Sequence, residues 1–176
     1  VIMVNNAGLR LVKIRVVQDR IPELGDKFCL TDDHEVFTTN GWVNIKDITT
    51  SHTVLQRNAV SGKGEWVHPK ETYIFDVYNS AKGDELYEFV SKNRQIVVTR
   101  KHRLWTNTGF ITAEDVQLGS TIVMGDENVK EVFVLKKVFS ENRKVYCISV
   151  PSQVFLVRFA GKEPLWTGNS NRHGQK

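Results

Sequence analysis

Two stretches of this chain, 68 residues apart, carry the same order of polar and apolar residues. The identical pairs are Thr31 and Thr99, His34 and His102, Thr38 and Thr106, Gly41 and Gly109, Asp47 and Asp115, and Thr53 and Thr121. The apolar positions keep the same register, since Phe37 matches Trp105 and Trp42 matches Phe110. Two unrelated β-hairpins can share a few identities, but they rarely share the hydrophobic register as well. The repeat therefore predicts a duplicated β unit with pseudo-two-fold symmetry.

Short apolar and β-branched segments separated by glycines run through the rest of the chain. They predict strands at 9–17, 35–39, 42–45, 53–57, 66–68, 72–78, 85–91, 94–99, 103–106, 109–112, 121–124, 130–139, 144–150, 153–159 and 163–166. Short helical turns are expected at 45–48 and 113–116, and no long stretch has helical periodicity. These patterns favour an all-β fold.

Charge and composition exclude several classes of function. The chain of 176 residues has a net charge of +4, but residues 29–169 hold 17 basic and 17 acidic side chains and are neutral as a group. Phosphate binding needs clustered Lys and Arg, so we expect no nucleic-acid surface in this central part. Two cysteines make neither a disulfide framework nor a zinc finger, and no apolar run is long enough to span a membrane. We expect no cofactor, no metal and no membrane partner.

The stretch Gly168-Asn169-Ser170 gains meaning beside Cys29. Removing residues 29–169 joins Arg20-Ile-Pro-Glu-Leu-Gly-Asp-Lys-Phe28 to Ser170-Asn-Arg-His-Gly-Gln-Lys176. The joined segment is continuous and basic, and it resembles the "IP-x-x-GDKF-x-x-RHGQK" stretch of the second-largest subunit of multisubunit RNA polymerases. The interruption resembles an intein, a self-excising protein insert. We therefore expect an N-terminal flank at 1–28, a splicing domain at 29–169 and a C-terminal flank at 170–176.

This resemblance implies the horseshoe-like β fold with internal duplication that inteins share with hedgehog autoprocessing domains. The insert of 141 residues has no room for a homing endonuclease, so it resembles a minimal intein. The chain does not begin with Met and stops within the polymerase-like motif, which indicates a fragment of a larger protein.

Cys29 is the expected first nucleophile. Its thiolate can attack the carbonyl of the preceding Phe28, so that the amide becomes a thioester and the amine of Cys29 is freed. The shift is uphill, because a thioester lacks amide resonance. Without the flanks, the alternative is a buried structural cysteine.

Thr99 and His102 form a Thr-x-x-His motif that resembles the second conserved motif of inteins. The acyl shift needs a proton donor for the departing amine, and imidazole suits this task because its pKa lies near neutrality. A hydroxyl such as that of Thr99, or a backbone N–H beside it, can stabilise the oxyanion. His34, the counterpart of His102 in the first copy, shows that the position can also be structural.

Asn169 and Ser170 are the expected residues of the later steps. The Ser170 hydroxyl takes the acyl group from the thioester, and the Asn169 side-chain amide attacks its own carbonyl and releases the insert as a succinimide. The freed Ser170 amine then forms a normal amide with Phe28.

The chain departs from the intein pattern at three positions. Cys147 lies in Val145-Tyr146-Cys147-Ile148-Ser149-Val150-Pro151, where inteins often have an Asp that relays protons; if it lies beside Cys29, an inhibitory disulfide is conceivable. Gly168 replaces the usual penultimate His, and a further His is usual near Gln153. Gly168→His should therefore speed cleavage of the C-terminal bond, if no other group has replaced the missing imidazole. Candidates to assist Asn169 instead are Cys147, His102, Arg158, Lys162 or a water.

Three alternatives stay open at this point. A hedgehog-like domain would share Cys29 and His102 but pass its acyl group to an external nucleophile. An intein that cleaves without ligating is a second alternative, and a non-catalytic nucleic-acid-binding β domain is a third. For the favoured reaction, we expect a single-turnover monomer that acts on its own flanks. After splicing, the host would bind other polymerase subunits and nucleic acid, in the nucleus or in the cytoplasm if it is archaeal-type.

Overall fold

The computed structural model describes residues 5–6, 8–9 and 27–169. At residues 5–9, β1 (Asn5–Asn6) pairs antiparallel with β2 (Gly8–Leu9). The strands that follow are β3 (Leu30–Thr31), β4 (His34–Thr38), β5 (Gly41–Asn44), β6 (Val54–Arg57), β7 (Gly64–Val67), β8 (Glu71–Val77), β9 (Leu86–Val90), β10 (Gln95–Thr99), β11 (Arg103–Thr106), β12 (Gly109–Thr112), β13 (Thr121–Gly125), β14 (Lys130–Phe139), β15 (Arg143–Ser149), β16 (Val154–Phe159) and β17 (Leu165–Gly168). Two short 3-10 helices, η3 (Ile45–Asp47) and η4 (Ala113–Asp115), interrupt them.

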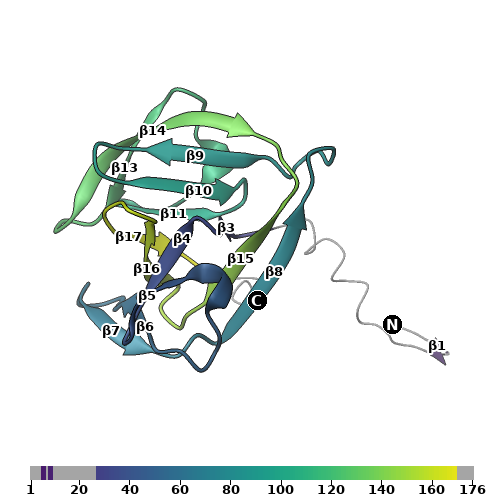
Figure 1. Ribbon diagram of the computed structural model, residues 1–176, viewed down its shortest axis with the longest axis horizontal. Helices are drawn as coiled ribbons and strands as arrows, with labels where there is room; N and C mark the ends of the chain where they lie inside the picture. Colours follow the sequence, from purple (N-terminus) through teal and green to yellow (C-terminus); the bar gives the residue numbers. More distant parts are fainter. Residues whose placement is uncertain (1–4, 7, 10–26, 170–176) are drawn as a thin grey trace.

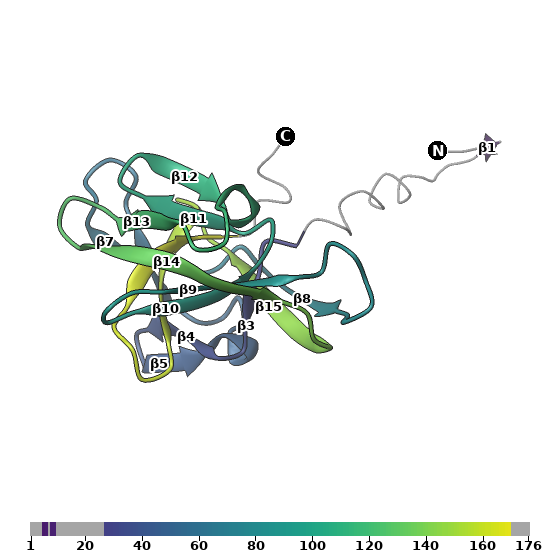
Figure 2. The ribbon, with the colours of Figure 1, turned by 90° about the horizontal axis from the view of Figure 1, so that it is seen from above.

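Within residues 27–169 the strands form two antiparallel sheets. The larger has the order β12-β11-β13-β14-β9-β10-β3-β15-β8, and the smaller has the order β17-β16-β4-β6-β7 with β5 paired to β4. Figure 1 shows β9, β10 and β14 on one side, β5, β6 and β7 on the other, and β3, β4 and β16 between them. In Figure 2 the long strands β14, β15 and β8 extend across the molecule. The larger sheet curls until β11 contacts β17 of the smaller sheet.

The predicted duplication is confirmed by the strand register. In the first copy Phe37 pairs with Trp42 across β4 and β5, and in the second copy Trp105 pairs with Phe110 across β11 and β12. Each hairpin turns at a glycine with positive φ and is followed by a 3-10 turn. Residues 68 positions apart therefore occupy equivalent places in equivalent units.

One large and one small cluster of buried side chains form the core. The large cluster lies between the two sheets and includes Phe89, Phe133 and Phe155, all fully buried. The small cluster contains both cysteines, Cys29 and Cys147, packed with Val77, Leu86, Val97 and Val145. The expected first nucleophile is thus part of an apolar cluster and is buried away from bulk water.

The expected all-β fold is confirmed, and the strands expected between residues 35 and 166 are observed to within two residues at most ends. The two expected helical turns are the 3-10 helices η3 and η4. The strand expected at 9–17 falls largely outside the described residues. Sequence analysis missed β3, since two residues are too few to show a period, and β3 forms only because β10 and β15 hold it on both sides. Among the described residues, no helix is long and apolar enough to cross a membrane.

Candidate active site

Cys29 lies immediately before β3, which is held between β10 and β15 of the larger sheet. Leu30, its neighbour, pairs with Val98 of β10 on one side and with Tyr146 of β15 on the other. This pairing brings Cys29 beside Cys147 of β15, with the two Cα atoms 4.6 Å apart, and the two side chains form a disulfide. Both residues are buried, with exposed fractions of 0% and 1%. The structure therefore shows the expected nucleophile in its oxidised, unreactive form.

Thr99 contacts the peptide bond that precedes Cys29. The backbone N–H of Cys29 donates to the Thr99 hydroxyl oxygen at 3.0 Å, and this hydroxyl in turn donates to the carbonyl of Lys27. The backbone N–H of Thr99 donates to the Cys29 carbonyl at 3.0 Å. We expected the Thr99 hydroxyl to donate to the oxyanion. It instead lies at the nitrogen that departs in the acyl shift, because its own proton is directed to Lys27.

The two residues before Cys29 are held firmly by the domain. The Lys27 ammonium forms an ion pair with Asp84 at 2.9 Å, and the Phe28 side chain is 8% exposed. The orientation of the Phe28–Cys29 bond is therefore fixed at three points. These are the side chain of Lys27, the carbonyl of Lys27 and the amide of Cys29. Such positioning supplies much of the rate advantage of an intramolecular attack.

His102 is fully buried and lies at the same peptide bond. Its Nε2 is 2.8 Å from the Thr167 hydroxyl of β17, whereas its Nδ1 is buried and makes no hydrogen bond of ordinary geometry in the described part of the chain. Burial, the Arg103 charge and His34 lower the pKa of His102 to about 3, and a backbone hydrogen bond with Phe28 opposes them. The imidazole is therefore neutral at pH 7 and lies beside the backbone of Phe28, the residue that Cys29 would attack.

His34 occupies the equivalent position in the first copy and is bonded differently. Its Nδ1 lies 2.9 Å from the Thr31 carbonyl, and its Nε2 accepts from the backbone N–H of Val97 at 3.3 Å. Burial lowers its pKa to about 4. Both ring nitrogens are engaged by backbone groups, so His34 is a structural residue.

Asn169 is held by the loop between β15 and β16. Its backbone N–H donates to the Gln153 carbonyl at 3.0 Å, and its side-chain Oδ1 accepts from the backbone N–H of Val150 at 3.4 Å. Gln153 has a φ of 71°, the one positive value for a non-glycine residue in the described ranges, and its side chain accepts from Arg103 at 2.8 Å. The loop therefore fixes both the backbone and the side chain of Asn169, the residue expected to cyclise.

Gly168 has no space for a side chain. A Cβ at this position would lie 2.5 Å from the carbonyl oxygen of Arg103 and 3.0 Å from the Phe110 ring. We expected that restoring a histidine at this position would speed cleavage, if no other group had replaced the missing imidazole. The packing argues the reverse, because any side chain would displace β17 from β11.

One short segment, Thr99 to Arg103, thus contacts both ends of the predicted insert. Thr99 and His102 contact the Phe28–Cys29 bond, and Arg103 packs against Gly168 and holds Gln153. The structure brings together Cys29, Thr99, His102 and Cys147, and it holds Asn169 nearby; Ser170 lies outside the described residues. Of the candidates to assist Asn169, Arg158 is instead paired with Glu35 at 2.7 Å.

Sequence analysis missed Thr167 and Arg103. The signal for Thr167 was the alternation along β17, where Leu165 and Thr167 are buried and Trp166 between them is not. A polar residue on the buried face of a strand needs a partner, and only the tertiary structure shows that the partner is His102.

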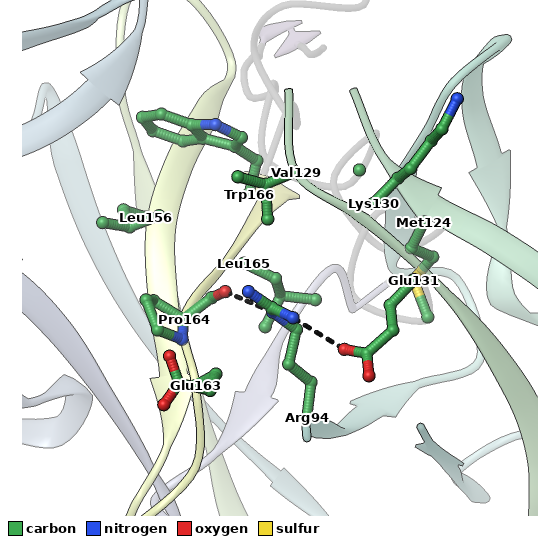
Figure 3. Close-up of a pocket in the computed structure, with 11 residues that line it drawn as sticks. Arg94, Met124, Val129, Lys130, Glu131, Leu156, Glu163, Pro164, Leu165 and Trp166 are labelled. Atoms are coloured by element: carbon green, nitrogen blue, oxygen red, sulfur yellow. Dashed lines mark hydrogen bonds and ion pairs between the residues drawn. The ribbon is translucent and has the colours of Figure 1, made fainter. Parts of the chain in front are cut away.

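The pocket shown in Figure 3 is lined by residues other than these. It has a volume of about 240 Å³ and is lined by Arg94, Met124, Glu131, Leu156 and Trp166 among others, and Arg94 bridges Glu131 and the Pro164 carbonyl across it. None of the candidate catalytic residues lines it. Among the described residues there is also no group of three or more His, Cys, Asp or Glu side chains suited to a metal. The reactive groups are instead packed around peptide bonds of the chain itself.

Comparison with known proteins gives two partial matches to curated proteins. A segment of 87 residues is 40% identical to the "DNA-directed RNA polymerase subunit beta C-terminal section" of Stigeoclonium helveticum, and a segment of 80 residues is 31% identical to the "ATP-dependent Clp protease proteolytic subunit" of Chlamydomonas moewusii. The segments span 48% and 46% of this chain but only 7% of each relative. Two unrelated host proteins thus contain segments similar to this chain.

Solved structures show the same fold. A bacterial intein-like domain from Clostridium thermocellum has a TM-score of 0.66 at 19% identity, covering 82% of this chain and 100% of that one. The AceL NrdHF class 3 split intein gives 0.64 at 22% identity (82% and 99% covered), and a DnaB intein from Synechocystis sp. PCC 6803 gives 0.61 at 16% (81% and 98% covered). The family model described as "Pretoxin HINT domain" matches residues 35–169. The chain therefore belongs to the Hint-domain family, whose fold it shares with autoprocessing and protein-splicing domains.

Proposed function

We propose that this chain splices itself, excising residues 29–169 and joining Phe28 to Ser170. The observation that carries the proposal is the arrangement around the Phe28–Cys29 bond. The Cys29 N–H of this bond donates a hydrogen bond to the Thr99 hydroxyl, and the Phe28 backbone lies beside the His102 ring. The segment that supplies both side chains also packs against Gly168 through Arg103. A structural motif would have no reason to direct a buried, neutral imidazole at a peptide bond next to a buried cysteine.

The first step requires the free thiol of Cys29. The thiolate attacks the Phe28 carbonyl carbon, the C–N bond breaks, and the departing nitrogen takes a proton to become the amine of Cys29. The hydrogen bond from the Cys29 N–H to Thr99 holds the nitrogen in place, and this nitrogen takes up the proton that the Cys29 thiol gave up. A pKa of about 3 excludes the expected proton transfer from His102 at neutral pH, so the neutral ring acts by donating a hydrogen bond to the oxyanion that forms on the Phe28 carbonyl. One such donor contributes about 10²- to 10³-fold in rate.

In the second step the Ser170 hydroxyl attacks the thioester carbonyl, releases the Cys29 thiol and forms an ester. The Asn169 side-chain nitrogen then attacks the Asn169 carbonyl, which breaks the Asn169–Ser170 bond and leaves a succinimide. The hydrogen bonds from Val150 and to Gln153 restrict Asn169 to few conformations, which favours this ring closure. Finally the Ser170 amine attacks the ester and forms the Phe28–Ser170 amide.

We also propose that the host is an RNA polymerase second-largest subunit. The flanking residues resemble the "IP-x-x-GDKF-x-x-RHGQK" stretch, and one partial relative is a polymerase beta section. On this proposal, the contacts that a spliced host makes with other subunits and nucleic acid depend on the flanks rather than on residues 29–169.

A cleavage-only reaction is the second candidate, and Gly168 favours it. Without an imidazole at this position, cyclisation of Asn169 loses the group that usually assists it, so hydrolysis of the thioester can compete even though Gln153 and Val150 hold Asn169 in place. The two outcomes differ in the products, since cleavage leaves the flanks separate.

Intact mass spectrometry of the reduced chain, followed over time, tests the proposal. We expect one species with the mass of residues 29–169 less one water, and another with the joined flanks. The Cys29→Ala variant should produce no ligated flanks, and Asn169→Ala should retain the C-terminal flank while forming a thioester or ester that hydroxylamine cleaves. Ligated flanks from Cys29→Ala would contradict the mechanism.

Gly168 variants examine the last step. We expect Gly168→Ala to slow release of the C-terminal flank about tenfold, because the new methyl group pushes β17 away from Arg103. Gly168→His should slow release further rather than restore speed. Faster release by Gly168→His would show that β17 can shift and that the missing imidazole limits the reaction.

A further inference from the structure

We propose that Thr167 is a positioning residue for the acyl shift: its hydroxyl donates to Nε2 of His102 and so directs Nδ1–H toward the Phe28 carbonyl. The inference rests on the proposed function of His102 at the Phe28–Cys29 bond. It adds a residue of β17, two positions before the C-terminal junction, to the machinery of the N-terminal junction.

The geometry of the two side chains carries the proposal. The Thr167 hydroxyl is 2.8 Å from Nε2, and the two residues are 1% and 0% exposed, so no water competes for this contact. Thr167 points to His102 because it lies on the buried face of β17, and β17 packs directly against β11, which begins one residue after His102. The contact is therefore built by the packing of β17 against the second repeat.

The direction of this hydrogen bond follows from the ring's other partner. A neutral imidazole has one N–H and one bare nitrogen. Nε2 is engaged by Thr167 at 2.8 Å, and Nδ1 has no hydrogen-bond partner among the described residues, so Nδ1 is the ring nitrogen left to face the Phe28 backbone. The Phe28 backbone lies close enough to the ring to raise the pKa of His102, which an N–H directed at the Phe28 carbonyl explains. The N–H is thus assigned to Nδ1, and Nε2 accepts from Thr167. Without the hydroxyl, nothing in the described contacts fixes this tautomer, and the bare nitrogen can face the carbonyl.

The same bond links the two junctions. His102 assists the breaking of Phe28–Cys29, and Thr167 is joined to Asn169 through Gly168 alone. If β17 moves away, for example after the C-terminal bond is cut early, His102 loses the partner that orients it. The link therefore makes the acyl shift depend on a correctly seated C-terminal strand.

The experiment compares Thr167→Val and Thr167→Ser in the full reduced chain carrying Asn169→Ala, which stops the last step. We expect Thr167→Val to slow formation of the hydroxylamine-sensitive species about 10- to 100-fold, and Thr167→Ser to stay within about threefold. Thr38→Val is the matched control, since Thr38 is also 1% exposed and its hydroxyl donates to Gly41 at 2.7 Å, but it does not contact His102.

A second readout reports the tautomer directly. In the unreactive Cys29→Ala, Asn169→Ala chain, ¹⁵N chemical shifts of His102 should show Nδ1–H, and Thr167→Val should shift the ring toward Nε2–H. An unchanged tautomer, or a rate loss no larger than that of Thr38→Val, would overturn the proposal. If the parent chain forms no thioester at all, the proposed function fails, and the ¹⁵N experiment still decides the role of Thr167.

The disulfide supports a second, independent proposal: Cys29 and Cys147 form a redox lock on splicing. Oxidation joins the two sulfur atoms and removes two protons and two electrons, which a low-molecular-weight disulfide accepts as it becomes two thiols. Reduction by a dithiol reverses the step and returns the Cys29 thiol. Since only the free thiolate can attack Phe28, the oxidised precursor cannot begin the reaction.

The fold places the two cysteines for this exchange. Their Cα atoms are 4.6 Å apart, within the ordinary range for a disulfide, and the pairing of β3 with β15 holds them there in either redox state. Both are buried in the small apolar cluster, so a reductant reaches them only when this part of the sheet opens. The lock is therefore expected to release slowly compared with an exposed disulfide.

The test compares the splicing rate of oxidised chain with and without a dithiol, while alkylation and intact mass follow the thiols. We expect the splicing rate with the dithiol to be at least a hundredfold higher than the rate without it. In Cys147→Ser the ratio of these two rates should fall to near one, whatever the absolute splicing rate of this variant. Two results would overturn the lock. One is splicing by chain that still holds the disulfide, and the other is a Cys147→Ser chain whose splicing rate still depends on the dithiol as strongly as that of the parent chain. Reduced chain that never reacts would instead count against the proposed function.

Discussion

His34 and His102 occupy the same position in the two halves of one duplicated unit, and they differ in what surrounds them. In the first copy backbone groups of Thr31 and Val97 engage both ring nitrogens. In the second copy a side chain, Thr167, engages one nitrogen, and the other is left beside the peptide bond before Cys29. The comparison teaches that the fold supplies a buried, neutral imidazole twice and that the neighbouring strand decides which groups contact its ring nitrogens.

The threonines differ in the same way. Thr31 donates to Asp33 at 2.8 Å and so stabilises its own turn. Thr99 accepts from the Cys29 amide and donates to the Lys27 carbonyl. Because Lys27 and Cys29 contact Thr99, the candidate catalytic residues gather at the second copy, whereas Thr31 contacts groups of its own turn.

The largest expected effect separates the two histidines. His102→Ala should slow thioester formation about 10²- to 10³-fold and leave the chain folded, because a hydrogen-bond donor to the oxyanion is lost. His34→Ala should act through stability, at a cost of about 1–3 kcal/mol for the backbone groups left without partners. Hydroxylamine cleavage gives the rates and urea unfolding the stabilities. If the two variants lose equal rate at equal stability, the comparison fails.

The threonine pair should show the next largest effect. Thr99→Val removes the acceptor from the Cys29 amide and should slow thioester formation about 10- to 100-fold. Thr31→Val should change this rate less than threefold, since Thr31 contacts only groups of the first copy. Thr99→Ser serves as the control that restores the hydroxyl. A slow Thr31→Val variant with normal stability would show that the first copy also takes part.

Acid should destabilise both copies alike. An unfolded histidine has a pKa of about 6.5, and burial lowers the pKa to about 4 for His34 and about 3 for His102. Between the unfolded and the folded pKa values, the unfolded chain binds more protons than the folded chain. The contribution of the neutral histidines to the free energy of unfolding is therefore fully present above pH 6.5, and it is lost as the pH falls toward the folded pKa values. Each histidine should raise the unfolding constant up to tenfold per pH unit.

Urea unfolding of the Cys29→Ala, Asn169→Ala chain between pH 7.5 and 4.5 measures this loss. His34→Gln and His102→Gln should each remove a similar share of the pH dependence, and the double variant should remove the sum. A pH dependence that follows only one histidine would mean that the other is not neutral in the folded chain.

The smallest effect should be equal in the two copies. Gly41 and Gly109 have φ of 93° and 108°, and a Cβ at either position would meet no atom within 4 Å. Alanine should therefore cost only backbone strain, about 1–2 kcal/mol in each hairpin. Urea unfolding of the two variants checks the equality, and a difference larger than about 1 kcal/mol would show that the hairpins have diverged.

Much of the fold was predictable from local patterns. The 68-residue repeat predicted the equivalent hairpins, and alternation with glycine punctuation predicted the strands, because strand formation and tight turns depend on nearby residues. The short strand β3 could not be predicted in this way, since its two residues form a strand only through partners far along the chain.

The candidate site was predictable only in part. The residues Cys29, Thr99, His102, Cys147 and Asn169 came from motifs and from the continuity of the flanks, and the structure places the first four around one cluster. Their partners did not come from the sequence. Thr167 and Arg103 carry no motif, and the expectation for a histidine at Gly168 was reversed by a carbonyl oxygen 2.5 Å from the missing Cβ.

The sequence by itself determined the duplication and the β architecture, because these follow from residue type and spacing along the chain, and the resemblance to inteins supplied the candidate reactive side chains. The tertiary structure decided which histidine faces a peptide bond, which hydroxyl orients it, and that Cys29 meets Cys147. Those contacts join residues between 65 and 118 positions apart. Chemistry at such a distance depends on how the two sheets pack, and no local pattern records that packing.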